Sequence, residues 1–145
     1  MEGDCLFVKT DANKAVIQRF VEEGMNQRNL SVLDELVAEG FIEDVPFPGQ
    51  GSGREGLKVA VGGFLEAFPD IVWTMHEQIA EDDKVVSRFT WTGTHRGAFF
   101  GVPATGRKVT VWGVVIDVVR DGKMVESRII MDTLGLMQQL GVIPS

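Results

Sequence analysis

The chain has 145 residues, 44% of them hydrophobic, which is enough for one domain with a buried core. Its formal charge of −7 argues against a nucleic-acid partner, because such binding depends on basic patches that neutralise phosphates. A single cysteine, Cys5, excludes an intrachain disulfide and argues against a cysteine-based metal site.

The sequence also carries no signature of targeting or of membrane insertion. The N-terminus is acidic and lacks the apolar segment of a signal peptide, and no apolar stretch approaches roughly 18 residues. We therefore expect a cytoplasmic protein that makes no membrane contact. Because no repeat or linker interrupts the chain, we expect one domain over residues 1–145, with residues 1–9 as a flexible arm.

The first half of the chain shows helical periodicity. Residues 11–27 carry apolar side chains at helical spacing, after Thr10 or Asp11 as a possible cap. A second, short helix is expected over residues 30–37, capped by Ser31, and a short strand over residues 41–45.

A third helix is expected over residues 54–68. The tetrapeptide Ser52-Gly53-Arg54-Glu55 has the form of a capping box, and Pro69 ends the helical pattern. The preceding segment, residues 46–53, is rich in Pro and Gly and is expected to be a loop.

From residue 70 the apolar pattern alternates with a period of two, which predicts strands. Residues 71–80 and 84–96 form one expected hairpin, and residues 108–120 and 123–132 form another across an Asp-Gly turn. Helices followed by strands indicate an α+β fold. We expect a curved antiparallel sheet that forms a cone or half-barrel around an interior pocket, with three N-terminal helices and a short C-terminal helix.

The turn between the last two strands predicts which residues share a face. If Asp121 and Gly122 are the two turn residues, Asp117, Arg128 and Asp132 lie on one face of this hairpin. A bulge would exchange the faces for part of a strand.

The first hairpin can be treated in the same way. Its acidic turn pairs Glu77 with Arg88, which predicts an exposed ion pair between neighbouring strands. The opposite face then presents an aromatic and imidazole set that is typical of a ligand pocket, namely His76, Phe89, Trp91 and His95.

Asp132 is the strongest candidate for chemistry. An acid beside Ile130 and Met131 is costly unless it is paired or has a task. The alternative is that Asp132 caps the expected helix over residues 133–140. Other polar groups have structural alternatives too, since each histidine can be a hydrogen-bonded core residue and Asp117 can pair with Arg128. The spacing of His76 and His95 matches no metal motif, so no metal site is expected.

Two segments resemble SnoaL-like polyketide cyclases. Residues 93–106 read GTHRGAFFGVPATG, which is similar to the family run GTHxGxFxGxPxTG, and the ending DGKMVE followed by DTLGLMQQLG is similar as well. The resemblance covers residues 11–144. It implies an α+β cone like that of nuclear transport factor 2 and ketosteroid isomerase. It also implies dimers or higher oligomers packed through the outer face of the sheet.

The resemblance implies an aldol-type ring closure of a small hydrophobic or polycyclic substrate, without a metal or organic cofactor. Asp132 would be the general base, because a carboxylate in an apolar pocket has a raised pKa and removes protons near neutrality. The expected substrate-binding residues are His76, Trp91, His95, Asp117 and Arg128.

Two other functions remain open from the sequence. Arg128 between two acids invites comparison with limonene-epoxide hydrolase, which uses an Asp–Arg–Asp set, although the spacing here differs. A module that only binds a hydrophobic ligand would use the same cone without chemistry.

Overall fold

The computed structural model describes residues 2–145, with side chains from Lys9 onward. The first helix is assigned from Glu2, so it begins well before the expected cap at Thr10 or Asp11. The expected arm over residues 1–9 lies largely outside the residues whose side chains are described.

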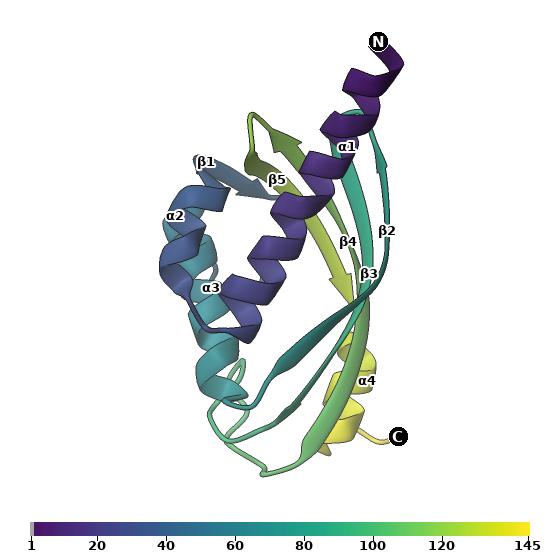
Figure 1. The fold of residues 1–145 in the computed structure, drawn as a ribbon. Helices are drawn as coiled ribbons and strands as arrows, with labels where there is room; N and C mark the ends of the chain where they lie inside the picture. The colour runs from purple at the N-terminus through teal and green to yellow at the C-terminus, as the bar shows by residue number, and fades with distance from the viewer. Residues whose placement is uncertain (1) are drawn as a thin grey trace.

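Three helical segments precede the main strands, as predicted (Figure 1). The helices are α1 (Glu2–Arg19), which continues as the π-helix η1 (Phe20–Asn26), the 3-10 turn η2 (Leu30–Val32) with α2 (Leu33–Leu36), and α3 (Gly53–Ala67). The short α4 (Thr133–Leu140) follows the last strand. Neither Ser31 nor Ser52 forms the expected side-chain cap, so both capping predictions are wrong.

Five strands form one curved, unclosed sheet in the order β1-β5-β4-β3-β2. The strands are β1 (Val37–Glu43), β2 (Val72–Glu81), β3 (Lys84–Thr94), β4 (Lys108–Arg120) and β5 (Lys123–Met131). The two long hairpins are antiparallel, whereas β1 pairs with β5 in parallel. The predicted α+β class is therefore confirmed.

The turn at Asp121-Gly122 is confirmed, since both residues have positive φ, as the favoured two-residue hairpin turn requires. The register beyond it shifts by one residue, because Val118 pairs with Glu126 and Val119 with Met124. Val125 is thus the extra residue of a bulge, and Asp117 pairs with Ser127.

A second bulge lies in β2. Glu77 pairs with Arg88 as predicted, with 2.9 Å between Nε and Oε1. Met75 then pairs with Phe89, so His76 is the extra residue and the predicted pairing of His76 with Phe89 is wrong.

The sheet curves around the ring of Phe89. A Cβ on Gly113, the partner of Phe89 on β4, would lie 2.6 Å from Cζ of that ring. Only glycine allows this close approach of the ring to the strand.

Helices α1, α2 and α3 lie on one side of the curved sheet, while α4 lies near β4 (Figure 1). Asn26, at the end of η1, holds the helical layer to β2. Its side chain accepts from Trp73 N at 2.8 Å and donates to Trp73 O at 2.9 Å. This double hydrogen bond fixes the end of the helical layer against the strand that carries Trp73.

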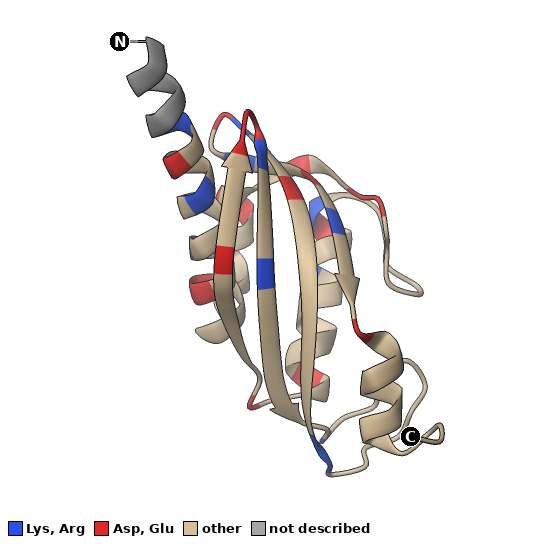
Figure 2. Cartoon of the chain, turned by 90° about the vertical axis from the view of Figure 1, so that its right-hand side faces the viewer, with Lys and Arg blue, Asp and Glu red and all other residues tan. Residues whose placement is uncertain are grey.

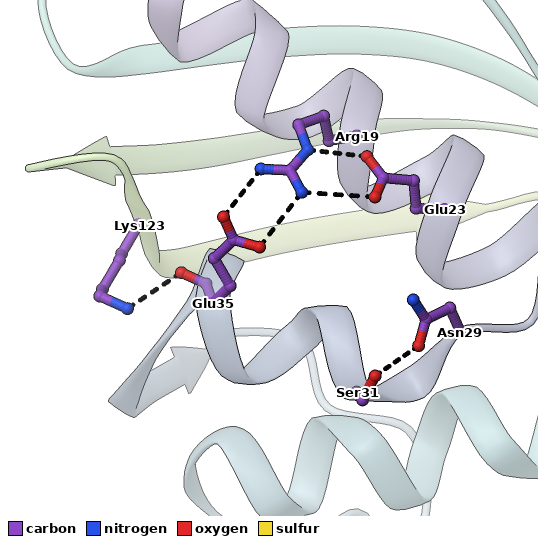
Figure 3. Close-up of polar contacts among 6 residues, drawn as sticks. All are labelled: Arg19, Glu23, Asn29, Ser31, Glu35 and Lys123. Carbon is purple, nitrogen blue, oxygen red and sulfur yellow. Dashed lines mark hydrogen bonds and ion pairs between the residues drawn. The ribbon is translucent and has the colours of Figure 1, made fainter.

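A second link joins α1 to α2 (Figure 3). Arg19 pairs with Glu23 at 2.7 Å and with Glu35 at 3.1 Å, while Lys123 donates to the backbone carbonyl of Glu35. These contacts raise the pKa of Arg19 and lower those of both acids. These groups are partly or largely exposed, so their main effect is to orient the helices rather than to stabilise the fold strongly.

Among the described residues, no helix has the length and apolar character that a membrane crossing requires.

Candidate functional site

A cavity of about 90 Å³ lies between the helical layer and the concave face of the sheet. Its helical wall is apolar and comes from α1, η1 and α3, with Ile17, Phe20, Val21, Val61 and Phe64. The three residues from the N-terminal helix span the change from α- to π-helix. A π-helical segment is rare and often lies at a functional site.

The polar groups of the cavity form a row across three neighbouring strands. Ser127 of β5 pairs with Asp117 of β4 on one side and with Glu43 of β1 on the other. All three residues line the cavity. Residues opposite one another on adjacent strands point to the same face. The register therefore brings two carboxyl groups and one hydroxyl together.

Asp117 is the buried acid of this row. It is 2% exposed, and within the described part of the chain its Oδ1 atom has no hydrogen-bond partner. Burial, together with the negative charge of Glu43, raises the pKa of Asp117 to about 7, although the Ser127 hydroxyl lowers it. A carboxyl group with such a pKa can both accept and release a proton near neutrality.

Glu43 is the second acid, and it is half-buried. Desolvation raises its pKa, as does the charge of Asp44, while the hydrogen bond from Val45 N and the neighbouring Ser127 hydroxyl lower it. Glu43 also lines an outward-facing groove with Gln50. It therefore lies between the interior cavity and the surface.

Ser127 lies beside both acids on the sheet, and its hydroxyl group lowers the pKa of each. It is 5% exposed. A hydroxyl group carries one proton, so it donates to one carboxylate at a time and can accept from the other acid when that acid is protonated. The row Glu43–Ser127–Asp117 is consequently suited to hold one proton between two acids.

Two further polar residues line the same cavity. Ser87 is buried and accepts a hydrogen bond from Gln78. Trp73 lies on β2, and its indole N–H is buried without a partner among the described residues. An unpartnered buried donor is costly, and a ligand can supply the missing acceptor.

Phe47, in the loop between β1 and α3, lies between the cavity and a surface groove. It lines both the cavity and this groove, which also contains Phe99 and Phe100. Its ring packs edge-on against Phe64 at 5.2 Å and stacks on Phe100 at 5.9 Å.

Asp132 lies elsewhere. Its Oδ1 atom accepts a hydrogen bond from Gly135 N at 2.9 Å, so Asp132 caps α4. It is not among the described residues that line the cavity. A Cβ on Gly135 would be only 2.1 Å from Asp132 Oδ2, which shows how closely the carboxyl group packs on the first turn of the helix. The capping alternative is therefore confirmed.

Arg128 points to the other face of the sheet. It pairs with Asp44 at 2.6 Å and with Glu126 at 3.0 Å, and its side chain is 51% exposed. The prediction that Asp117, Arg128 and Asp132 share one face is wrong, because the bulge at Val125 reverses the faces along β5. An Asp–Arg–Asp set of the epoxide-hydrolase kind does not form.

His76 is exposed, and its Nε2 atom lies 2.8 Å from Thr90 Oγ1. The bulge in β2 places it away from the cavity lining. His76 was expected on the same face as Phe89 and Trp91, and that placement is wrong.

His95 and Trp91 are fully buried, but neither is among the described residues that line the cavity. His95 Nδ1 accepts from Thr105 N at 3.1 Å, and its ring lies 5.4 Å from that of Phe68. Trp91 donates its indole N–H to Met131 Sδ at 3.3 Å. His95 therefore has the hydrogen-bonded core position that was its structural alternative, and Trp91 is also a core residue.

Of the predicted site residues, the structure thus brings only Asp117 into the cavity. Sequence reasoning missed Glu43, Ser127 and Trp73. The alternation of β5 could have revealed Ser127 once the bulge was known. The role of Glu43 depends on the parallel pairing of β1 with β5, for which the sequence carries no local signal.

The described residues contain no group of three or more His, Cys, Asp or Glu side chains arranged to hold a metal ion.

Comparisons with known proteins agree with this architecture. Residues 15–140 match the family model of SnoaL-like polyketide cyclases. TsrD from Streptomyces laurentii is similar in structure, with a TM-score of 0.84, 28% identity, and coverage of 92% of this chain and 97% of that chain. A candidate SnoaL-like polyketide cyclase from Jannaschia sp. CCS1 has a TM-score of 0.82 and 26% identity, with 93% and 95% covered.

AclR from Streptomyces galilaeus, named as a candidate hydroxylase, has a TM-score of 0.81 and 29% identity, with 94% of this chain and 85% of that chain covered. No curated protein sequence matches the chain. The sheet order, the cone and the family match agree, and the chain belongs to the SnoaL-like polyketide cyclase family.

Proposed function

We propose that this protein catalyses proton transfer in an aldol-type cyclisation or isomerisation, with Asp117 as the general base. Family membership and the structural relatives support a function of cyclase or isomerase type. The observation that carries the assignment to Asp117 is its unpartnered carboxyl oxygen in the lining of an apolar cavity.

Asp117 meets the physical requirements of such a base. A pKa near 7 makes the carboxylate more basic than an ordinary aspartate and still leaves much of it ionised at neutral pH. The apolar walls exclude water, which strengthens electrostatic interactions inside the cavity. Removal of a proton from carbon next to a carbonyl then requires a hydrogen-bond donor for the enolate oxygen. Trp73 carries the unpartnered donor of the lining.

Asp117 would complete the cycle by returning the proton to the alkoxide of the aldol product, or to another carbon in an isomerisation, which restores the ionised base. Ser127 and Glu43 lie beside Asp117 in the same row, and Glu43 also lines the outward-facing groove. They offer a path by which the proton held on Asp117 can exchange with solvent. In keeping with the family resemblance, we propose that no organic cofactor takes part.

The proposal can be tested on the first chemical step alone. Cyclohexanone in D2O exchanges its α-protons when a base forms the enolate, and NMR follows the loss of their signal. We expect the protein to accelerate this exchange and Asp117→Asn to reduce the acceleration roughly 100-fold or more. Asp132→Asn is the matched acid-to-amide control and should keep the parental rate. An unchanged rate in Asp117→Asn would exclude Asp117 as the base.

A binding protein without catalysis is the second candidate. It is favoured by the cap that Asp132 forms, which assigns the acid singled out by the sequence a structural role. In that case, ligands would bind in the cavity and no variant would change a rate, because the protein would not accelerate the exchange.

We further propose a homodimer packed through the outer face of the sheet. Figure 2 shows that the strands are mostly uncharged, with charged residues toward the hairpin turns apart from the ion pair of Glu77 on β2 with Arg88 on β3. Its apolar side chains are more than half exposed: Val72, Ile79, Trp112 and Ile130. Exposed apolar patches of this kind mark interaction surfaces, and the family resemblance implies packing through this face.

A further inference from the structure

We propose that the cavity binds a molecule of about one ring that carries no negative charge and presents a hydroxyl or amine donor to Asp117. This inference concerns the same cavity as the proposed function and names its class of ligand. It follows from three features of the lining, namely its charge, its unpartnered acceptor and its size.

The charged residues in the described lining of the cavity are all acidic. Among the described residues that line the cavity, Glu43 and Asp117 are acids and none is Lys, Arg or His. Arg128, which follows Ser127 on β5, is on the outer face, where it pairs with Asp44. A ligand carboxylate would therefore enter an apolar space beside two acids with no positive partner, which is strongly unfavourable.

The unpartnered acceptor indicates which polar group a ligand would present to Asp117. Asp117 Oδ1 is buried and lacks a hydrogen-bond partner among the described residues. A buried carboxyl oxygen in this condition is satisfied by an O–H or N–H donor. An ammonium group would add a charge-assisted hydrogen bond when Asp117 is ionised.

The size of the cavity limits the ligand. On the scale by which one water molecule needs roughly 10–15 Å³, the 90 Å³ cavity holds about six to nine non-hydrogen atoms. One six-membered ring with a short substituent fits this volume. A polycyclic substrate does not fit unless the helical layer moves outward.

Three probes of one ring separate these properties. Benzylamine, benzyl alcohol and benzoate differ chiefly in charge, and their dissociation constants can be measured by calorimetry at pH 8, where Asp117 is mostly ionised. We expect benzylamine to bind at least tenfold more tightly than benzyl alcohol, and benzoate to bind more weakly than either. Equal or tighter binding of benzoate would overturn the proposal, as would the failure of all three to bind.

Site-directed variants test whether benzylamine binds through Asp117 or is attracted in general to a protein with a charge of −7. Asp117→Asn should remove most of the preference for benzylamine, whereas Glu77→Gln, which removes one exposed charge on the outer face, should keep it. A preference that survives in Asp117→Asn would contradict the assignment.

The proposed ligand class and the proposed catalysis can be contradicted independently of each other. If the probes bind as expected and no exchange of cyclohexanone protons occurs, the ligand class stands and the proposed catalysis does not. If exchange depends on Asp117 while benzoate binds best, the catalysis stands and the ligand class is wrong.

Discussion

Ser127 lies directly opposite Asp117 across β4 and β5, and the next strand places Glu43 on its other side. The hydroxyl group lowers the pKa of both acids. Three residues from three neighbouring strands thereby form one polar row in a largely apolar cavity. In the proposed function, this row supplies the base and the polar groups beside it.

The stability of the protein should depend on the ionisation of Asp117. Its pKa is about 7 in the folded chain, against an ordinary value of 3.8, so the folded state binds the proton more tightly than the unfolded state. The free energy of unfolding therefore falls as pH rises from about 4 through about 7. Asp117→Asn removes this loss, and at pH 8 it should be more stable than the parent by up to roughly 4 kcal/mol.

Chemical denaturation at pH 5 and pH 8 tests whether Asp117→Asn changes the free energy of unfolding in the predicted direction. The gain from Asp117→Asn should be clearly larger at pH 8, while Glu77→Gln, an exposed control, should change stability little at either pH. A variant that is less stable than the parent at pH 8 would show that the ionised carboxyl group is well satisfied in the fold.

The two acids should titrate as a coupled pair. Because the charge of Glu43 helps to raise the pKa of Asp117, Glu43→Gln should lower that pKa while burial keeps it above the usual range for aspartate. Carbon-13 NMR of the aspartate carboxyl groups over pH 3 to 9 measures this directly. Glu126→Gln, on the outer face beside Arg128, serves as the control. An unchanged Asp117 titration in Glu43→Gln would mean that the acids do not interact.

Asp132 should behave as a helix cap. Asp132→Ala removes the acceptor for Gly135 N and should cost about 1 kcal/mol, whereas Asp132→Asn should retain most of the stability. Urea denaturation of both variants distinguishes them. Equal stability of the alanine variant and the parent would show that the hydrogen bond to Gly135 contributes nothing.

The outer face should hold the proposed dimer together. Trp112→Lys or Ile130→Lys places a charge on this apolar surface and should yield a monomer in sedimentation experiments. Val59→Lys changes an equally exposed apolar residue on α3, which lies on the helical side, and should leave the dimer intact. A parent protein that is monomeric at all concentrations would refute the proposal.

The sequence predicted the positions of the helices and strands along the chain better than it predicted which face of the sheet each side chain occupies. The strands 108–120 and 123–131 and the helix 133–140 follow from alternation, turn chemistry and helical spacing. The bulges at His76 and Val125 have no local signal, and each exchanges the inner and outer faces beyond it. For this reason Asp117 was expected beside Arg128, whereas it lies beside Ser127.

The position of Glu43 beside Ser127 shows a second limit of prediction from the sequence. Glu43 comes next to Ser127 through a parallel pairing of segments more than 80 residues apart in the chain. Such a contact depends on how the whole sheet assembles, because the short β1 could also have paired elsewhere. Asp132, by contrast, was expected chiefly as the general base, and the cap was its alternative. The cap follows from the local position of Asp132 directly before the predicted helix.

The most direct test of the central claim compares Asp117→Asn with Asp132→Asn in the exchange of cyclohexanone α-protons in D2O. The proposal predicts that the parent protein and Asp132→Asn accelerate the exchange equally and that Asp117→Asn loses nearly all of the acceleration. Loss of exchange in Asp132→Asn, with the full rate kept in Asp117→Asn, would contradict it.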